Sequence, residues 1–390
     1  MKYAYLKNGN VIAQLKRNLP ICDTKETSGP DAFICDFLRR VQGQKVLMLS
    51  QHTQKGRYSD EFIMAQVYPL KRGFPGNISN AVILFVKVLS RLNTFKPERI
   101  ICGRLGPMLW AATLYSRICS VPIAYSCHNR VFHSTDPLYK RVLGFLDSVC
   151  IRKASACICH GPYLVDHISK LGVDHSQIIE FDVDFQDMLE EMERPMDSSE
   201  IPSLKCGRYI LFVGRLEKNK GIFDLLKASR EVLSREPDVK LVYIGNGADF
   251  EQLLLEVEGS EFKGRIELLG EVSHSGLASI IKNCRFLVTP TQREFPEGRC
   301  MAAMEALVLG IPVIAPKFGP FQYLVKHKVN GLLFTPDNVG SLQACINLLF
   351  ESQVLYDDLK AGARRTGDEL MRPDKTFGEA VECAFYLSSD

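Results

Sequence analysis

Two basic side chains follow an apolar run in the segment FVGRLEKNKGIFDLLKA, residues 212–228. The run predicts a buried strand that ends at Gly214, and a helix is predicted to begin near Gly221. Arg215 and Lys220 would then lie at the carboxyl end of the strand. A diphosphate bound there would meet two positive charges and a helix N-terminus, which together stabilise a departing nucleoside diphosphate. The alternative is that both cations are ordinary surface-loop residues.

Two carboxylates stand eight residues apart in TPTQREFPEGRCMAAMEALVLGIPVIAP, residues 289–316. If the segment is helical, the rise per residue separates Glu297 and Glu305 by roughly 12 Å, on the order of the distance between the two sugars of a nucleotide sugar. Each carboxylate could accept hydrogen bonds from a diol, and the free amides of 298–301 between them would favour a diphosphate. Glu294 competes for the first position, and Glu305 on a wet helix face is the alternative for the second.

The elements that must position these residues alternate regularly after residue 207. Short β-branched runs, each followed by a segment with helical periodicity, predict six strands. They are Tyr209–Gly214, Val239–Gly245, Arg265–Gly270, Arg285–Pro290, Pro312–Pro316 and Gly331–Phe334. Strands that are apolar throughout and joined by helices indicate a parallel, doubly wound α/β sheet, which binds ligands at the carboxyl ends of its strands.

The first half shows the same pattern less regularly. Predicted strands are Lys45–Ser50, Arg99–Gly103, Pro122–His128 and Ala156–His160, and predicted helices lie near 31–42, 78–94, 106–119 and 136–152. We therefore predict two Rossmann-like domains facing each other across a cleft, where substrate pockets tend to occur. The predicted boundaries are 1–190, a linker at 191–206, and 207–390, with the last helix a candidate to pack back on the first domain.

Composition limits the class of protein. The 390 residues are 46% hydrophobic and 24% charged, as in soluble globular proteins. No apolar run approaches the roughly 20 residues that span a bilayer, and the N-terminus lacks the features of a signal peptide, so we expect a cytoplasmic protein. The 13 cysteines are odd in number and lie mostly in apolar runs, which favours reduced thiols. The cluster Cys150, Cys157, Cys159 and His160 lacks the paired spacing of a zinc site, and no metal is expected.

Positive charge is concentrated in the first half of the chain. Residues 1–170 contain 24 Lys and Arg against 10 Asp and Glu, a net charge of +14, whereas an acidic stretch runs from Asp182 to Glu200. This distribution points to an anionic partner, either a phosphorylated acceptor or an anionic lipid surface. The alternative is a scattered, solvated positive surface. Nucleic acid is not expected, because no recognition helix, zinc finger or RNA-binding motif is present.

Taken in order, these segments resemble the retaining glycosyltransferases of family 4, the group 1 transferases with the GT-B fold. The ordered series FVGRLEKNKG, IGNGADFEQLL, IELLGEV, EGRCMAAMEALVLGIPVIAP and NGLLF is similar to the C-terminal domain of that family over about residues 207–352, and it includes the family's Glu-x7-Glu motif.

The resemblance implies roles for single residues. Arg215 and Lys220 would hold the donor diphosphate, Glu297 would contact the hydroxyls of the donor sugar, and Glu305 would bind the ribose. The base would lie near 269–272. The donor-binding residues implied in this way are Glu305, Gly214, Gly298, Arg299, Cys300, Met301 and Gly270.

In the first domain, VPIAYSCHNRVFHS resembles the family's strand that ends in a histidine near the donor sugar, which implies a catalytic role for His128; His133 and His160 are its rivals. The glycine-pair loop that the family carries after its first strand is not evident, and only 28–30 could replace it. The Asp-x-Asp triplet at 182–184 resembles a metal motif of the other glycosyltransferase fold. We set it aside because Arg215 and Lys220 already supply the positive charge that a metal would bring.

These features predict a retaining transferase that moves a sugar from a nucleotide-sugar donor to an acceptor hydroxyl without a metal or other cofactor. The acceptor is expected on the basic first domain, as a glycan or lipid-linked glycan of cell-surface polysaccharide or glycolipid assembly. The apolar helix 78–92, flanked by Lys71, Arg72, Lys87 and Arg91, is either a core helix or an attachment to an anionic leaflet. The competing functions are a nucleotide-sugar epimerase or hydrolase on the same fold and a non-catalytic nucleotide-sugar-binding protein.

Overall fold

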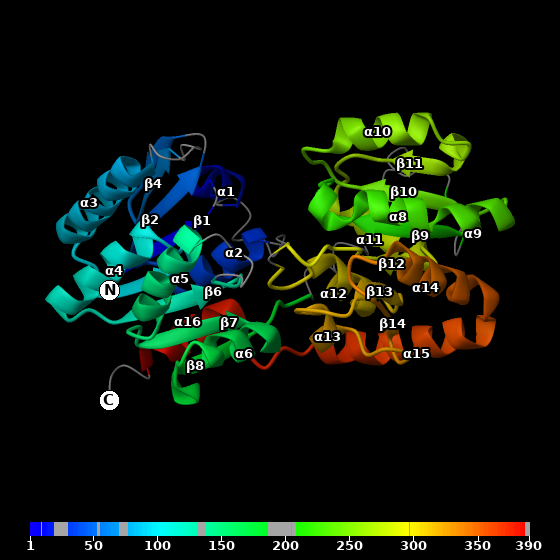
Figure 1. Ribbon diagram of the computed structural model, residues 1–390. Helices are drawn as coiled ribbons and strands as arrows, with labels where there is room; N and C mark the ends of the chain where they lie inside the picture. The colour runs from blue at the N-terminus through cyan, green and yellow to red at the C-terminus, as the bar shows by residue number, and fades with distance from the viewer. Residues whose placement is uncertain are drawn as a thin grey trace. The chain divides into compact units, whose positions relative to one another are not determined.

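A computed structural model of the chain describes residues 1–8, 10–18, 30–52, 55–69, 77–131, 138–185, 204, 208–295 and 297–386. The chain forms two compact units (Figure 1). Unit 1 contains Met1–Val183 and Asp374–Asp390, and unit 2 contains Asp184–Pro373. The predicted linker at 191–206 lies outside the described residues apart from Leu204, so this boundary stays a prediction.

Unit 1 is built on an eight-stranded sheet in the order β3-β4-β2-β1-β5-β6-β7-β8. Only β3 and β4 pair in an antiparallel manner; the other neighbours are parallel. The strands are β1 Lys2–Asn8, β2 Lys45–His52, β3 Gly56–Ser59, β4 Ile63–Pro69, β5 Arg99–Cys102, β6 Ile123–Cys127, β7 Ala156–His160 and β8 Ile178–Phe181. The four strands predicted for this half are confirmed as β2, β5, β6 and β7.

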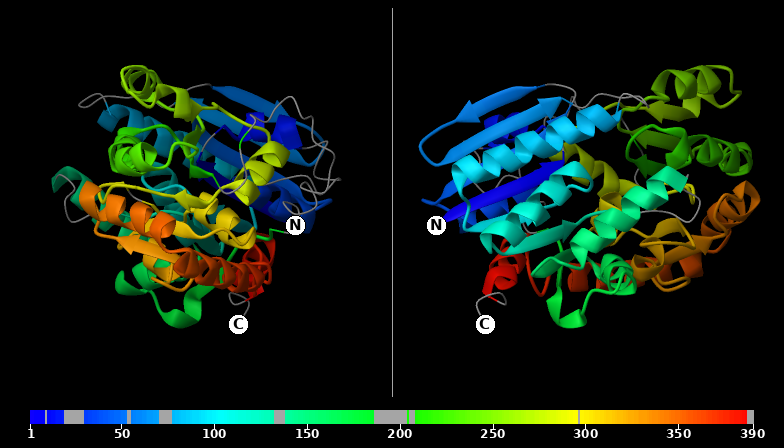
Figure 2. Two further views of the ribbon diagram at one scale, coloured as in Figure 1. Left: turned by 90° about the vertical axis from the view of Figure 1, so that its right-hand side faces the viewer. Right: turned by 60° about the vertical axis from the view of Figure 1, so that its left-hand side comes forward.

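Helices cover both faces of this sheet, because successive residues of each strand point to opposite faces and both sets are apolar. Ala4 and Leu6 of β1 belong to one core and Tyr3 and Tyr5 to the other. The first core is covered by α3 Asn77–Phe95, α4 Pro107–Cys119, α5 Leu138–Ile151 and α6 Pro162–Lys170. The second is covered by α1 Val11–Asn18, α2 Pro30–Arg40 and α16 Phe377–Tyr386. The right-hand view of Figure 2 shows α3 lying along one face of the blue strands.

The sequence prediction for the start of unit 1 was wrong. It overlooked β1, which is the fourth strand across the sheet and pairs with both β2 and β5. The chain after this strand passes through Asn10, whose side chain accepts a hydrogen bond from the Ala13 amide at 3.1 Å. Residues 28 and 29, which were predicted to replace the family's loop, lie outside the described residues. The pattern KYAYLKN hid the strand, because Tyr and Lys side chains look surface-exposed although Tyr5 and Lys7 are buried here.

The six strands predicted for unit 2 are all confirmed. They form one parallel sheet in the order β11-β10-β9-β12-β13-β14. The strands are β9 Tyr209–Val213, β10 Lys240–Ile244, β11 Ile266–Leu268, β12 Phe286–Val288, β13 Val313–Pro316 and β14 Gly331–Phe334. This order is that of a doubly wound dinucleotide-binding sheet, in which the crossovers are helical.

The crossovers and C-terminal segments of unit 2 are helices of 4 to 18 residues. They are α8 Ile222–Ala228, α9 Arg230–Arg235, α10 Phe250–Glu258, α11 His274–Asn283, α12 Met301–Val308, α13 Phe321–Leu324, α14 Val339–Glu351 and α15 Gln353–Leu370. Short 3-10 turns are η1 His175–Gln177 of unit 1 and η2 Lys218–Lys220 and η3 Lys263–Arg265 of unit 2. No helix among the described residues has the length and apolar character needed to cross a membrane.

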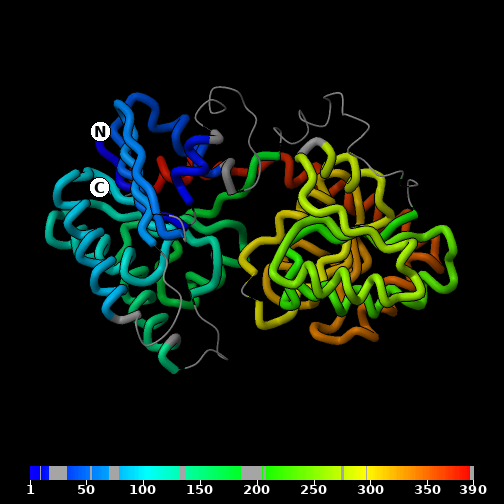
Figure 3. Tube along the Cα trace, turned by 90° about the horizontal axis from the view of Figure 1, so that it is seen from above, coloured from blue at the N-terminus to red at the C-terminus, as the bar shows by residue number. Residues whose placement is uncertain are grey.

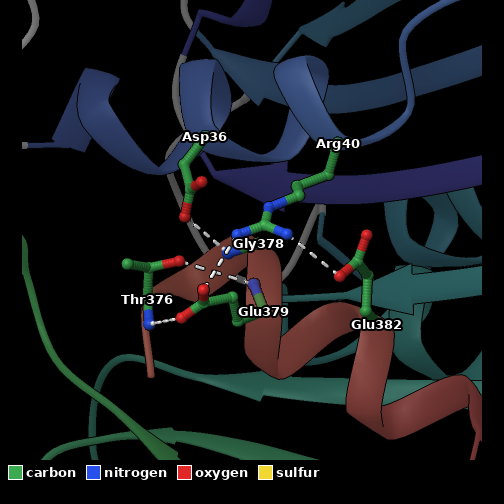
Figure 4. A network of polar contacts seen from close by, with 6 residues as sticks. All are labelled: Asp36, Arg40, Thr376, Gly378, Glu379 and Glu382. Carbon is green, nitrogen blue, oxygen red and sulfur yellow. Dashed lines mark hydrogen bonds and ion pairs between the residues drawn. The ribbon is translucent and has the colours of Figure 1, made fainter. Parts of the chain in front are cut away.

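The last helix, α16, packs in unit 1 against α2, β7 and β8, where Figures 1 and 3 show it in red among blue and green elements. Its start is a capping box: the Thr376 hydroxyl accepts from the Glu379 amide, and the Glu379 carboxylate accepts from the Thr376 amide. Figure 4 shows how α2 holds this end. Asp36 accepts from the Gly378 amide at 2.6 Å, and the Arg40 guanidinium lies 2.9 Å from Glu379.

In unit 2, the long helix α15 supports α12, the helix that carries Glu305. A glycine makes this packing close. A Cβ atom on Gly367 would lie 2.4 Å from the Leu307 carbonyl oxygen and 2.9 Å from the Cα of Val308, both backbone atoms of α12. A backbone cannot turn away as a flexible side chain can, so only glycine fits at this position without a shift of one helix.

We expect Gly367→Ala to destabilise the protein by about 1–3 kcal/mol, because the overpacking exceeds the gain of roughly 1 kcal/mol in helix propensity. Gly264→Ala is the matched control, since a Cβ there meets nothing within 4 Å, and it should change stability by less than about 0.5 kcal/mol. Urea unfolding of both variants measures the difference. Equal stability of the two variants would contradict the packing argument.

Candidate functional site

The loops at the carboxyl ends of three neighbouring strands of unit 2 touch backbone to backbone. A Cβ on Gly221, which has φ +75°, would lie 1.9 Å from the Pro290 carbonyl oxygen, and a Cβ on Gly245 would lie 2.0 Å from the Gly214 carbonyl oxygen. Main-chain hydrogen bonds add to these contacts, such as the one from Gln292 to the loop after β9 at 2.9 Å. The loops after β9, β10 and β12 therefore form one platform at the edge where such sheets bind ligands.

An ion pair with little exposure lies on this platform. Lys220 Nζ is 2.5 Å from the Glu297 carboxylate, and the two side chains are only 15% and 12% exposed. The same ammonium group lies 4.0 Å from the centre of the Phe295 ring, close enough for a cation–π interaction. Lys220, predicted to hold the donor diphosphate, and Glu297, predicted to contact the donor sugar, thus contact each other. An ammonium has three N–H groups, so Lys220 can keep Glu297 and still donate to a phosphate.

Arg215 borders the same aromatic ring. Its guanidinium carbon is 5.3 Å from the centre of the Phe295 ring, and it pairs with Glu217 at 2.9 Å. The Arg215 side chain is 58% exposed, so it can move to meet a ligand at modest cost. The structure therefore places Arg215 and Lys220 together at the carboxyl end of β9, around Phe295. Sequence reasoning missed Phe295, whose only signal was an aromatic residue between Glu294 and Glu297.

The helix start between the two glutamates differs in part from the prediction. Helix α12 begins at Met301, so 297–300 are not helical and the separation of roughly 12 Å calculated from helical rise does not apply. Cys300 is the N-cap residue, and no side chain caps the helix. Within the described residues, the amides of Gly298, Cys300, Met301 and Ala302 donate to no acceptor. These amides are available to an anion.

The side chains around this helix start are held in different ways. Arg299 Nε lies 3.1 Å from the Met304 sulfur. Burial, and then the neighbouring Glu297 carboxylate, raise the pKa of the Cys300 thiol to about 12, so the thiol is neutral and unreactive. Glu294, the competitor for the first acidic position, is exposed, whereas Glu297 is paired. Gly270, at the loop after β11, accepts a hydrogen bond from Gly245 at 2.7 Å.

Glu305 is the most unusual group of the site. It lies in α12 with little exposure, and among the described residues it has no hydrogen-bond or ion-pair partner. Loss of hydration on burial raises the pKa of its carboxyl to about 7. A desolvated carboxylate without a partner is costly, and such groups are common where a ligand supplies the missing hydrogen bonds. The prediction of a wet helix face for Glu305 is therefore not supported.

The raised pKa of Glu305 predicts a pH-dependent stability. The folded protein binds this proton more tightly than the unfolded chain, so stability is highest below about pH 4.5 for this group and falls as pH rises toward about 7. We expect Glu305→Gln to remove this fall and to gain on the order of 2 kcal/mol relative to wild type between pH 5 and pH 8. Chemical denaturation of both proteins at pH 5 and at pH 8 measures this change in the free energy of unfolding.

Glu258→Gln, at an exposed position of α10, is the control and should track wild type at both pH values. If the free energies of unfolding of Glu305→Gln and wild type differ by the same amount at pH 5 and pH 8, the pKa of Glu305 is not raised and its carboxyl is fully hydrated.

The second group of predicted residues lies at the carboxyl edge of the unit 1 sheet. His128 follows β6, and its Nε2 lies 2.9 Å from the Ser126 hydroxyl. Burial, followed by the nearby His160 and Lys7, lowers the pKa of His128 to about 3, so the imidazole is neutral. His160 stacks on Phe181 with ring centres 5.0 Å apart and lies 3.4 Å from Asp182. His133 lies outside the described residues.

The rings of Phe33, Phe377 and Phe181, which come from distant segments, surround His128. Phe33 of α2 lies 5.4 Å from His128, and Phe377 of α16 lies 6.1 Å from it. Sequence reasoning missed these rings because their segments are far apart in the chain. It also missed Lys7, which lies at the end of β1, is only 8% exposed and donates to Gln14 at 2.8 Å.

Metal ligands do not gather in the part of the chain that the structure describes: no group of three His, Cys, Asp or Glu residues is close enough to hold an ion. The described cysteines are free thiols. Asp182 of the Asp-x-Asp triplet contacts His160 and the Val183 amide.

A comparison of the sequence with family models identifies residues 196–366 as matching the model described as Glycosyl transferases group 1. Residues 196–366 thus carry a domain of the group 1 glycosyl transferase type. The match contains all the residues that were predicted to bind the donor in unit 2.

Curated relatives match only part of the chain. An uncharacterised glycosyltransferase of Methanocaldococcus jannaschii is 35% identical over 137 residues, which are 35% of this chain and 34% of that protein. The phosphatidyl-myo-inositol mannosyltransferase of Mycolicibacterium smegmatis is 27% identical over 43% of this chain and 42% of that protein. The matched part thus spans less than half the length of either relative.

Solved structures match the whole chain in fold. HepE of Anabaena, solved in complex with UDP, has a TM-score of 0.69 and 18% identity, with 100% of each chain covered. The lipopolysaccharide outer core galactosyltransferase WaaB has a TM-score of 0.64 and 17% identity, again with 100% of each chain covered. These likenesses establish the GT-B fold, which the sequence analysis predicted.

Proposed function

We propose that this protein is a group 1 glycosyl transferase, a retaining hexosyltransferase that moves a sugar from a nucleotide-sugar donor to an acceptor hydroxyl without a metal ion. The observation that carries the proposal is the platform of unit 2, where Lys220, Glu297 and Phe295 lie beside the uncapped start of α12. It supplies a cation, a carboxylate, an aromatic face and free amides at the ligand-binding edge of the sheet. The structural relative HepE has been solved with UDP-glucose, which supports a nucleotide-sugar donor.

Each of these groups has a chemical role in the proposal. Lys220 and Arg215 donate hydrogen bonds to the diphosphate and stabilise the charge that develops when it leaves. Glu297 accepts from hydroxyls of the donor sugar, and Glu305 accepts from the ribose hydroxyls, which restores the hydrogen bonds that burial removed. The two cations take the place of a metal. Retention of configuration follows from the family resemblance, as does a role for the neutral His128 of unit 1 in contacting the sugar.

We expect a nucleoside diphosphate to raise the melting temperature of the wild-type protein, with or without magnesium. Lys220→Ala and Glu305→Ala should each weaken binding by about tenfold or more, because each removes a charge-assisted hydrogen bond. Lys227→Ala, an exposed cation of α8, is the control and should bind as wild type. Thermal-shift titrations with UDP, GDP, ADP and their sugars measure these affinities, and indifference to every nucleotide would overturn the donor site.

Turnover separates the competing functions. A transferase releases the nucleoside diphosphate only when an acceptor is present, whereas an epimerase or hydrolase turns over the donor alone. A binding protein would show a saturable thermal shift and no turnover with any acceptor fraction. The anomeric configuration of the product, followed by NMR, tests retention.

The acceptor part of the proposal is a glycan or lipid-linked glycan of cell-surface polysaccharide or glycolipid assembly, with the protein attached peripherally to the cytoplasmic face of a membrane. Support comes from the outer surface of α3, α4 and α5. Apolar residues are exposed there on each helix, among them Val86 (56%), Ile118 (70%) and Phe145 (61%). The only acidic residue in these three helices is Asp147, which is buried and hydrogen-bonded to Trp110. An apolar and cationic surface of this kind suits an anionic bilayer.

Charged substitutions on α3 test this attachment. We expect Val82→Asp with Val86→Asp to reduce cosedimentation with phosphatidylglycerol vesicles severalfold, because two carboxylates would enter the anionic interface. Leu255→Asp, at a position 73% exposed on α10 of unit 2, is the control and should leave binding unchanged. Equal vesicle binding by all three proteins would remove the membrane from the proposal.

A further inference from the structure

Unit 1 contains a cavity that the proposed function does not use. It has a volume of about 510 Å³ and lies between the last turns of α3 and the strands β1 to β4. Lys2 and Lys45 are the first residues of β1 and β2, so the cavity lies toward the amino ends of these strands. Ligands of parallel sheets bind at the carboxyl ends, and the donor loops belong to unit 2. The cavity is thus separate from the carboxyl edge of the unit 1 sheet and from the loops of unit 2 that are proposed to bind the donor.

Strand register explains why basic side chains gather here. Lys2 of β1 pairs with Lys45 of β2, so both side chains point to the same face. Arg57 of β3 lies opposite Gln66 of β4, and Gln66 accepts a hydrogen bond from Arg91 of α3 at 2.9 Å. Four cations from three strands and one helix therefore line one cavity.

Within the described residues, no carboxylate forms an ion pair with these four cations, although Glu98 lies next to Lys2, whose carbonyl oxygen accepts a hydrogen bond from the Glu98 amide at 2.9 Å. None of the described residues that line the cavity is acidic. The nearest acid along β3 is Asp60, whose carboxylate is occupied by Tyr58 Oη at 2.9 Å and by the amides of Phe62 and Ile63. Like charges held together in a concave site repel one another, and a bound polyanion would relieve the repulsion.

The size and lining of the cavity narrow the class of anion. A volume of about 510 Å³ is in the range of small-molecule sites and exceeds the need of an inorganic phosphate. Apolar side chains, Leu47, Met64 and Phe95, lie beside the cations. Arginine forks favour phosphate oxygens in two-point contacts, and the apolar wall suits a short organic group.

We propose that this cavity is a binding site for an organic phosphate, held by Lys2, Lys45, Arg57 and Arg91. The phosphate ester belongs either to a soluble phosphorylated molecule or to the headgroup of an anionic phospholipid. The helices α3, α4 and α5 on the same face of the sheet expose apolar residues, and such a surface suits the lipid alternative.

The test compares two double variants that remove the same charge. Lys45→Gln with Arg57→Gln alters two exposed residues of the cavity, and Lys16→Gln with Lys153→Gln alters two exposed residues elsewhere in unit 1. Glycerol 1-phosphate is titrated by calorimetry, and phosphatidylcholine vesicles with and without phosphatidylglycerol are tested by cosedimentation. Measurements are repeated in Lys220→Ala, so that phosphate bound at the donor loops is not counted.

We expect the cavity variant to lose roughly tenfold or more in affinity for at least one probe, because two charge-assisted hydrogen bonds are removed, while the control variant binds as wild type. Loss confined to glycerol 1-phosphate identifies a soluble ligand, and loss confined to phosphatidylglycerol vesicles identifies a lipid. Equal loss in both double variants, or no saturable binding of either probe, would overturn the proposal. Nucleotide thermal shifts should be unchanged in the cavity variant, so failure here is distinguishable from failure of the donor site.

Discussion

Backbone contact between the loops of unit 2 is the constraint on which its site depends. Where Gly221 meets Pro290 and Gly245 meets Gly214, the peptides lie closer than any side chain would allow. The loops therefore cannot move independently, and Lys220 and Glu297, 77 residues apart in the chain, are held within 2.5 Å. A partly buried ion pair contributes little net stability, because the loss of hydration offsets the attraction. Its position at the ligand-binding edge argues that it orients two groups for a ligand.

On the same platform, burial raises the pKa of two acidic groups, with different consequences. At Cys300, burial keeps the thiol protonated, so this residue contributes shape and a backbone amide rather than chemistry. At Glu305, burial destabilises the charged form and leaves a carboxyl that changes its protonation state near neutral pH. A ligand that donates hydrogen bonds to Glu305 stabilises its charged form, so binding and ionisation of this group are coupled.

The positive charge of unit 1 is not spread evenly over its surface. Lys7 and Arg104 lie at the carboxyl edge of the sheet, where Arg104 bonds Asn8 and Gln51. Four other cations line the cavity near the amino ends. The helical layer formed by α3, α4 and α5 has a single acidic residue, and this one is buried. Part of the positive charge is therefore grouped locally, which the net charge of the sequence does not show.

The sequence by itself determined the elements whose signal is local. Apolar, β-branched runs between helical segments were sufficient for all six strands of unit 2 and for four strands of unit 1, because such strands are buried on both faces. The cations after β9 and the two glutamates near α12 could also be recognised, because the residues of each motif lie within one short segment of the sequence.

Tertiary structure decided what depends on distant partners. Strand β1 escaped notice because Tyr5 and Lys7 become buried only when β2 and β5 flank them. The pairing of Lys220 with Glu297, and the rings of Phe33 and Phe377 around His128, join segments whose separation in the chain carries no local signal. Burial and contact are properties of the packed chain, so the protonation states of Glu305 and His128 could not be read from residue types alone.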